Sequence, residues 1–150
     1  MKRFYGGAIL LGVFGAVSIP TVEAAETPAR LVSFATLEKR LGEPNLRLLD
    51  ARPKADYDKG HIPGAVWADP KAVEAMAAKP GALKDRATWE KWIAPLGIGP
   101  KTEILVYDAK RQLDAARLWW LLGYLGVDSV GLIDGGFGLC VRVSVCGVVL

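Results

Sequence analysis

Short apolar blocks recur along this chain from about residue 31, and turn residues separate them from segments in which apolar positions repeat at helical spacing. Strands are predicted over residues 31–32, 46–49, 65–67, 103–107 and 130–133. Helices are predicted over residues 34–41 after the N-cap Ser33, 69–78, 89–96 after the N-cap Thr88, and 113–125. This alternation predicts an α/β fold, with a mostly parallel five-stranded sheet and helices on both faces.

The predicted helix over residues 113–125 is apolar almost all round. A helix with this pattern is buried on most of its surface. We therefore expect the aromatic residues Trp119, Trp120 and Tyr124 to belong to the core and not to a cofactor site.

Residues 139–150 break the pattern, because three valines alternate with polar residues and no turn follows. The alternation predicts a strand. In an extended chain, Cys140 and Cys146 would lie on one face about 20 Å apart, which is too far for a disulfide. Their spacing is not that of a standard zinc or redox motif.

The first 24 residues have the pattern of a secretory signal peptide. Lys2 and Arg3 precede an apolar run over residues 8–19, and a polar end closes at Ala24. Cleavage near Ala24 predicts an exported protein, periplasmic or secreted. The run is too short for an ordinary membrane span, so no stable membrane anchor is expected, although an uncleaved anchor is the alternative.

The chain carries 19 Lys and Arg against 16 Asp and Glu, a formal net charge of +3, and it has no long basic run. This distribution argues against nucleic-acid binding. The single histidine, His61, argues against a histidine-based metal site.

The most informative segment is residues 104–117, a buried strand followed by a six-residue loop and the start of a helix. Such a loop directs backbone N–H groups and the positive end of the helix at one point, which suits an anion. A thiolate at the head of the loop would be strongly activated, but Asp108 stands there. A carboxylate carries no sulfur, and we expect it to accept backbone N–H bonds at the helix start. The loop consists of Asp108, Ala109, Lys110, Arg111, Gln112 and Leu113.

Other polar and glycine positions are predicted to have structural roles. Asp50 and Arg52 flank the end of a strand, where an ion pair or loop hydrogen bonds are expected. His61 is expected to fix a turn that also contains Gly64. Asp134, Gly135 and Gly136 form a turn in which the glycines permit positive φ.

Five motifs together resemble the rhodanese (sulfurtransferase) domain family over about residues 31–138. They are LLDAR at 48–52, YDKGHIPGA at 57–65, VYD at 106–108, AARLWW at 115–120 and LIDGGF at 132–137. The spacing is most similar to the first, non-catalytic domain of two-domain thiosulfate or 3-mercaptopyruvate sulfurtransferases. The resemblance implies a rhodanese-like sheet and a loop cysteine as sulfur carrier in catalytic members, at the position of Asp108. It implies no metal and no organic cofactor.

The resemblance also suggests how the chain is organised. Residues 1–24 are predicted as the signal peptide, 25–138 as an incomplete rhodanese-like domain, and 139–150 as an atypical Val-rich tail. The family continues into a terminal helix, which is expected to be missing or altered here. A truncated or frameshifted product is the preferred interpretation of the tail, and a genuinely short member is the alternative.

The function implied is sulfur transfer from thiosulfate or 3-mercaptopyruvate, with this chain itself predicted to be an inactive first domain or fragment. Its expected partners are a second, catalytic rhodanese domain absent from the chain and, in the intact parent, a small sulfur-containing anion. The alternative is an exported, non-catalytic rhodanese-fold module that binds a partner.

Overall fold

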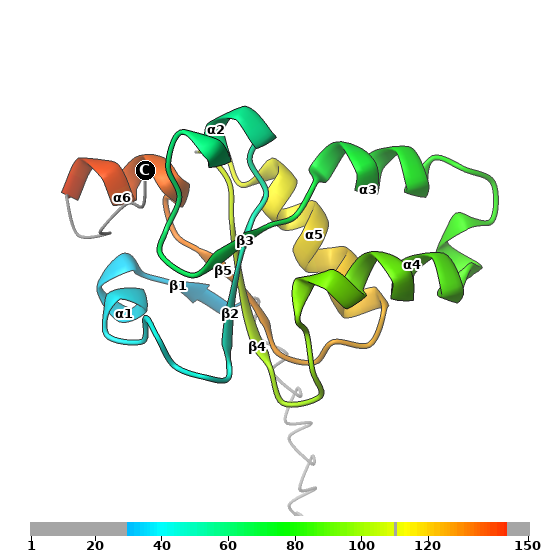
Figure 1. The fold of residues 1–150 in the computed structure, drawn as a ribbon, viewed down its shortest axis with the longest axis horizontal. Coiled ribbons are helices and arrows are strands. Elements are labelled where there is room, and N and C mark those ends of the chain that lie inside the picture. The colour runs from blue at the N-terminus through cyan, green and yellow to red at the C-terminus, as the bar shows by residue number, and fades with distance from the viewer. Residues whose placement is uncertain (1–29, 110, 144–150) are drawn as a thin grey trace, which may run out of the picture.

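The computed structural model describes residues 30–109 and 111–143. Its centre is a five-stranded sheet with the order β1-β5-β4-β2-β3, in which every pair of neighbours is parallel (Figure 1). The strands are β1 (Arg30–Val32), β2 (Leu46–Asp50), β3 (Ala65–Trp67), β4 (Glu103–Tyr107) and β5 (Val130–Ile133). The predicted α/β class and the five-stranded parallel sheet are therefore confirmed.

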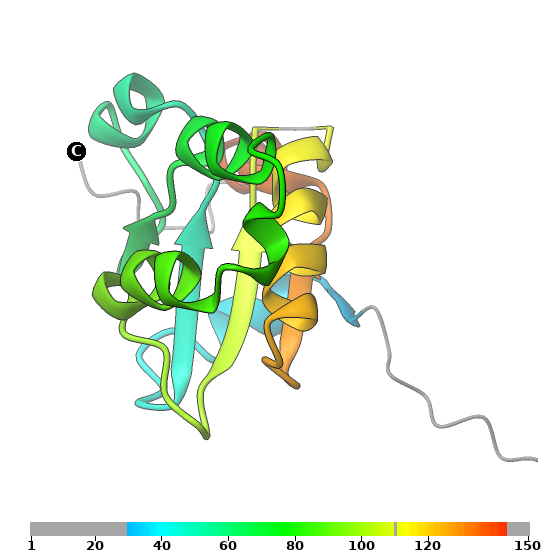
Figure 2. The ribbon, with the colours of Figure 1, turned by 90° about the vertical axis from the view of Figure 1, so that its right-hand side faces the viewer.

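Helices cover both faces of the sheet. They are α1 (Phe34–Glu38), α2 (Lys54–Asp58), α3 (Pro70–Ala77), α4 (Arg86–Ile93), α5 (Leu113–Tyr124) and α6 (Gly136–Val143), with short 3-10 helices η1 (Ala82–Lys84) and η2 (Ala94–Leu96). Figure 2 looks onto the face covered by α3, α4 and α5, and α1 and α6 lie on the opposite face. Two hydrophobic clusters correspond to these two faces.

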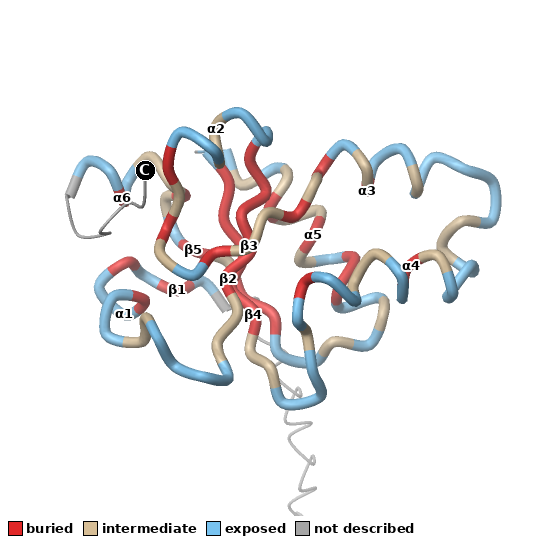
Figure 3. Tube along the Cα trace, viewed as in Figure 1, coloured by how far each residue is buried: buried red, intermediate tan, exposed pale blue. Residues whose placement is uncertain are grey.

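Strand β4 shows how the sequence makes a sheet with two buried faces. Ile104 and Val106 belong to the cluster under α3, α4 and α5, whereas Leu105 and Tyr107 belong to the cluster under α1 and α6. Successive side chains of a strand point to opposite faces, so a strand covered on both sides is apolar throughout. Figure 3 shows this buried centre running through the middle of the molecule.

Helix α4 begins earlier than the sequence analysis predicted. The expected N-cap, Thr88, lies inside the helix, because the Asp85 carboxylate accepts hydrogen bonds from both the Thr88 backbone N–H and its hydroxyl. Two residues suited to capping stand three positions apart, and the carboxylate is the one that caps. The helix therefore covers Arg86–Ile93.

The prediction that the aromatic residues of α5 belong to the core is wrong for two of them. The buried stripe of α5 is made by Ala115, Leu118, Leu121 and Leu122, at helical spacing. Trp120 and Tyr124 lie on the other side of the helix and are 52% and 51% exposed. The sheet covers one side of α5, and no described element covers these two rings.

The strand predicted over residues 139–150 is also wrong for residues 139–143, which belong to α6. Phe137 and Cys140, three positions apart, both pack into the cluster under α1 and α6, which is helical spacing. The terminal helix was expected to be missing or altered, and the structure has a helix over Gly136–Val143, so it is not missing. Residues 144–150 lie outside the described residues.

Cys140 is fully buried and disulfide-bonded. The distance that we expected between the two cysteines rested on an extended chain, and the helical backbone at Cys140 removes that premise. The other cysteine of the chain, Cys146, lies outside the described residues.

The predicted signal peptide over residues 1–24 also lies outside the described residues. In the part of the chain that the structure describes, none of the helices has the length and apolar character needed to cross a membrane.

Candidate functional site

The loop between β4 and α5 lies where the carboxyl ends of the central strands meet. In parallel α/β sheets, ligands bind beyond these ends. The structure describes this loop except for residue 110, so Lys110 is outside the description. Figure 2 shows the loop at the same edge as the starts of α3 and α5.

Asp108 occupies the positive end of α5 with its own side chain. It is 5% exposed. Its Oδ1 accepts the Gln112 backbone N–H at 3.0 Å, and its Oδ2 accepts those of Asp114 at 3.2 Å and Ala115 at 3.4 Å. The N–H groups at the start of α5 that would hold an external anion are therefore engaged by an internal carboxylate.

Gln112 shapes the last turn of this loop. Its φ of 58° is the only positive φ among the described non-glycine residues. The Gln112 side-chain amide donates to the Ile133 carbonyl oxygen at 2.6 Å, which anchors the turn to the end of β5. The hydrogen bond to Ile133 at the end of β5 therefore stabilises the strained backbone conformation of Gln112.

The turn at Asp134, Gly135 and Gly136 supports the loop from the next strand. Both glycines have positive φ, 75° and 57°. The Phe137 backbone N–H donates to the Asp108 carbonyl oxygen at 2.7 Å, and the Gly138 N–H donates to that of Ala109 at 2.9 Å. The start of α6 therefore holds the backbone of the loop directly.

A buried ion pair lies at the end of β2. Arg52 donates from Nη2 to Asp50 Oδ2 at 2.6 Å and from Nε to Asp50 Oδ1 at 3.0 Å. Arg52 also donates to the Gly60 carbonyl oxygen at 2.7 Å. Asp50 is fully buried and Arg52 is 4% exposed. Both charges have therefore lost most of their contact with water, and each is compensated by the opposite charge of its partner.

Tyr107 and Phe137 complete this network, and the sequence analysis missed both. The Tyr107 hydroxyl donates to Asp50 Oδ2 at 2.7 Å and accepts the Ile62 backbone N–H at 3.2 Å. Burial, and then the Asp50 carboxylate, raise the pKa of Tyr107 far above its usual value. The Arg52 guanidinium carbon lies 3.5 Å from the centroid of the Phe137 ring. The one indication in the sequence was a tyrosine at the end of a buried strand, whose hydroxyl needs a partner.

His61 holds the turn before β3. Its Nδ1 lies 3.1 Å from the Tyr57 carbonyl oxygen, and its ring stacks on the Tyr57 ring at 4.0 Å. Gly64, in the same segment, has a φ of 78°. These residues shape a turn at the sheet edge, and their contacts are with the segment itself.

A cavity of about 210 Å³ lies beside the loop. Its lining residues are Ala51, Arg52, Pro53, Asp108, Ala109, Arg111, Leu113 and Asp114. None of these described residues is Cys, Ser or Thr, so they supply neither a thiol nor an aliphatic hydroxyl as a nucleophile. Among the described residues there is also no group of three or more His, Cys, Asp or Glu side chains placed to hold a metal ion.

The family model for the rhodanese-like domain matches residues 33–139 of this chain. A thiosulfate sulfurtransferase from Pseudomonas aeruginosa is 38% identical over 71% of this chain and 40% of its own length. A 3-mercaptopyruvate sulfurtransferase from Escherichia coli is 30% identical over 67% of this chain and 40% of its own length. The chain thus spans about 40% of the length of these two relatives.

The fold is similar to that of a solved structure from Escherichia coli, described as a 3-mercaptopyruvate sulfotransferase with the rhodanese fold. The two superpose with a TM-score of 0.65 and 26% sequence identity, over 77% of this chain and 48% of the other.

Proposed function

Because this chain belongs to the rhodanese family, we propose that it serves sulfur transfer from thiosulfate or 3-mercaptopyruvate as a non-catalytic rhodanese domain. One observation carries the proposal. The Asp108 carboxylate stands at the head of the loop and accepts three backbone N–H bonds from the start of α5.

A carboxylate at this position does not perform the sulfur-transfer step. In that step a thiolate attacks the outer sulfur of the donor, forms a new S–S bond, and releases sulfite from thiosulfate or pyruvate from mercaptopyruvate. The Asp108 oxygens form no stable bond of this kind. Their negative charge also repels an anionic donor in the cavity that Asp108 helps to line.

The remainder of the frame supports a structural role for the loop. Asp50, Arg52 and Tyr107 satisfy one another's hydrogen bonds at the ends of β2 and β4, just before the loop. The first turn of α6 holds the loop backbone by donating to the carbonyl oxygens of Asp108 and Ala109. The preserved frame without a nucleophile fits a domain that pairs with a second, catalytic rhodanese domain. The small sulfur-containing anion would then bind to that second domain, in an exported protein of the periplasm or the medium.

The test is a thiocyanate assay with the full chain, with thiosulfate or 3-mercaptopyruvate as donor and cyanide as acceptor. The Pseudomonas aeruginosa relative is the positive control. We expect no turnover above the uncatalysed rate and no persulfide by intact-mass measurement. Turnover that persists in a Cys140→Ser, Cys146→Ser double variant with an unchanged circular dichroism spectrum would remove the proposal, because an unassigned group would then do the chemistry.

We propose a non-catalytic binding module as the second candidate. Leu113, 65% exposed, lies beside Arg111 at the mouth of the same cavity, which is an apolar contact point next to a positive charge. Sequencing of the gene beyond codon 150 separates the two candidates. A downstream rhodanese domain with a loop cysteine favours the sulfurtransferase, and its absence favours the binding module.

A further inference from the structure

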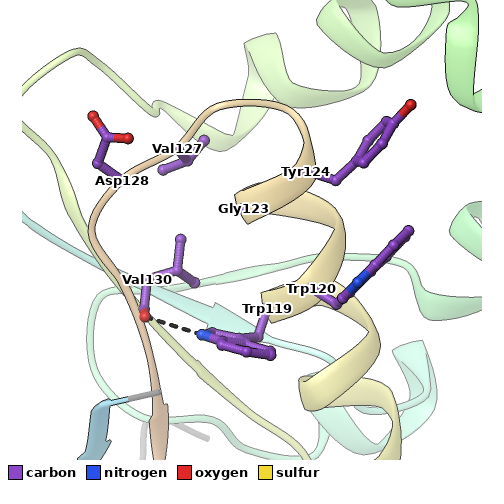
Figure 4. Close-up of a pocket in the computed structure, with 7 residues that line it drawn as sticks. All are labelled: Trp119, Trp120, Gly123, Tyr124, Val127, Asp128 and Val130. Atoms are coloured by element: carbon purple, nitrogen blue, oxygen red, sulfur yellow. Dashed lines mark hydrogen bonds between the residues drawn. The ribbon is translucent and has the colours of Figure 1, made fainter. Parts of the chain in front are cut away.

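The side of α5 that faces away from the sheet carries a line of side chains that the described elements leave accessible. Figure 4 shows the rings of Trp120 and Tyr124 one turn apart on this side of the helix. Trp119 turns the other way, toward Val130, whose carbonyl oxygen accepts the indole N–H at 3.2 Å. We call the accessible line the outer stripe, and it consists of Leu113, Arg117, Trp120 and Tyr124.

The outer stripe follows from the spacing of its residues along the helix. Its four positions are separated by four, three and four residues. At about 100° per residue, they fall within roughly 60° of one another around the helix axis. The buried stripe of α5 lies on the other side of the helix. Helix α5 therefore has a second, mostly apolar side besides the one that packs on the sheet.

The aromatic part of the outer stripe is already ordered. The rings of Trp120 and Tyr124 stack at 5.5 Å with an interplanar angle of 16°, and each side chain is half exposed. Because the two rings support each other, a partner that covers them orders little that is not ordered already. Large exposed aromatic surface of this kind is typical of a protein–protein contact.

We propose that the outer stripe is a contact between two copies of this chain, with their α5 helices packed antiparallel about a two-fold axis. The axis passes through the middle of the stripe. Leu113 of one copy then lies level with Tyr124 of the other copy. Arg117 likewise lies level with Trp120 of the other copy, and the symmetry makes each contact twice. This contact is independent of the proposed sulfur transfer.

The charge in the outer stripe favours the antiparallel arrangement. It brings the Arg117 guanidinium group within reach of the Trp120 ring of the other copy, where a cation–π contact forms. Arg117 Nη1 also donates to Asp114 of its own copy at 2.7 Å, which compensates part of its charge. A parallel pair would place the two Arg117 side chains level with each other, and their positive charges would repel.

The size of the outer stripe sets the strength of the contact. A large aromatic side chain buries roughly 150–250 Å², so two half-exposed rings supply about 200 Å² in each copy, to which Leu113 adds. A standard stable interface buries about 800 Å² for each partner. We therefore expect a weak, reversible dimer with a dissociation constant on the order of 10–100 μM.

Sedimentation equilibrium of the full chain, at concentrations that span this range, tests the proposal. We expect a monomer–dimer equilibrium. Trp120→Ala should raise its dissociation constant at least about tenfold, because a central tryptophan commonly carries much of the binding energy. Arg117→Gln should raise it several-fold, because the cation–π contact is lost. Val141→Ala is the matched control, since it shortens an exposed apolar side chain of α6, on the other face of the sheet, and should leave the constant unchanged.

Photocrosslinking tests the orientation of the two helices. A benzophenone amino acid replaces Leu113 in a mixture of isotopically light and heavy chains, so crosslinks between copies are recognised by mass. Trypsin cleaves after Arg111 and Arg117 and separates residues 112–117 from residues 118–142. We expect position 113 of one copy to crosslink to the peptide 118–142 of the other copy, which contains Tyr124.

Three outcomes would overturn the proposal. A chain that stays monomeric throughout would leave the outer stripe to a different partner. A dimer that is equally strong in Trp120→Ala would place the contact elsewhere on the surface. Crosslinks between copies that are absent, or confined to residues 112–117, would exclude the antiparallel pair. Trp120 lies outside the buried stripe of α5, and circular dichroism checks that its variant is folded.

Discussion

Gly136 lies against the backbone of Asp108, so closely that a Cβ atom on Gly136 would come within 2.7 Å of the Asp108 carbonyl oxygen. Asp108 directly follows β4 and Gly136 follows β5, and the two residues meet where these neighbouring strands end side by side. The loop that carries Asp108 can therefore approach the turn after β5 this closely only because Gly136 has no side chain.

Gly136→Ala should destabilise the fold by at least about 2 kcal/mol, because it adds a backbone clash to the cost of a positive φ. The φ of Gly136 is 57°, and the atoms that it would meet are backbone atoms, which yield little. Urea denaturation measures the loss. Gly64→Ala is the matched control, since Gly64 has a φ of 78° and open space where a Cβ atom would lie, and about 1 kcal/mol is expected there. Equal losses at the two sites would contradict the close packing at Gly136.

Asp108→Ala should lower the free energy of unfolding by about 1–3 kcal/mol, because the carboxylate that caps α5 is lost and buried N–H groups are left without a partner. Asp108→Asn retains one oxygen acceptor and should lose less. Thermal or urea unfolding of the three proteins at neutral pH gives the order. If the Ala variant were as stable as the parent chain, the bonds to Gln112, Asp114 and Ala115 would contribute nothing to the fold.

The part of the fold that follows from local pattern could be predicted from the sequence. The bounds of β3, β4 and β5 agree with the predicted ranges, because apolar residues bounded by turn residues leave few alternatives. The start of α4 was misplaced because Asp85 and Thr88 both suit an N-cap. The course of α6 depends on hydrogen bonds from its first turn to Asp108 and Ala109, which no local pattern contains.

The same division applies to the candidate site. The partners of Asp108 lie within seven residues of it, so a helix-start contact was foreseeable from the spacing alone. The hydrogen bond from Tyr107 to Asp50 joins residues 57 positions apart and becomes visible only when β2 and β4 are paired. The exposed rings of Trp120 and Tyr124 were misassigned because the apolar pattern of α5 does not show which of its sides is left uncovered.

Asp108→Cys should create a reactive thiol, because it places sulfur at the start of α5, where N–H groups and the helix dipole favour a thiolate. The rate of alkylation by iodoacetamide at neutral pH should exceed that of an unstructured cysteine peptide by about tenfold or more. Intact-mass measurement after incubation with thiosulfate should show an added sulfur atom.

The matched control for this variant is Leu113→Cys, an exposed position one turn away in the same loop-to-helix segment. It should alkylate at the rate of an ordinary exposed thiol and take up no sulfur. Cys140 is buried and disulfide-bonded, so it should not contribute to the reaction of the folded protein. Equal rates at positions 108 and 113 would show that the loop no longer provides an anion-stabilising frame.

Tyr107→Phe should destabilise the fold by about 1–3 kcal/mol at neutral pH, because Asp50 loses a donor and the Ile62 N–H loses its acceptor. The pH dependence should also change. The folded-state pKa of Tyr107 lies well above its ordinary value of 10.0, through burial first and Asp50 second. The stability that this gives is therefore complete below pH 10 and is lost as the pH rises further, because the unfolded tyrosine releases its proton while the folded one retains it.

Urea unfolding at neutral pH and in steps above pH 10 measures this difference. The difference in free energy of unfolding between the parent chain and Tyr107→Phe should narrow as the pH rises above 10. Only the parent chain has a tyrosine at position 107 that ionises on unfolding, and this ionisation favours the unfolded state. Tyr124→Phe is the matched control, because Tyr124 is half exposed and its removal should leave the slope unchanged. A gap that stays constant through this range would mean that Tyr107 ionises as readily in the folded protein as in the unfolded chain, and the buried bond to Asp50 would then not hold the proton.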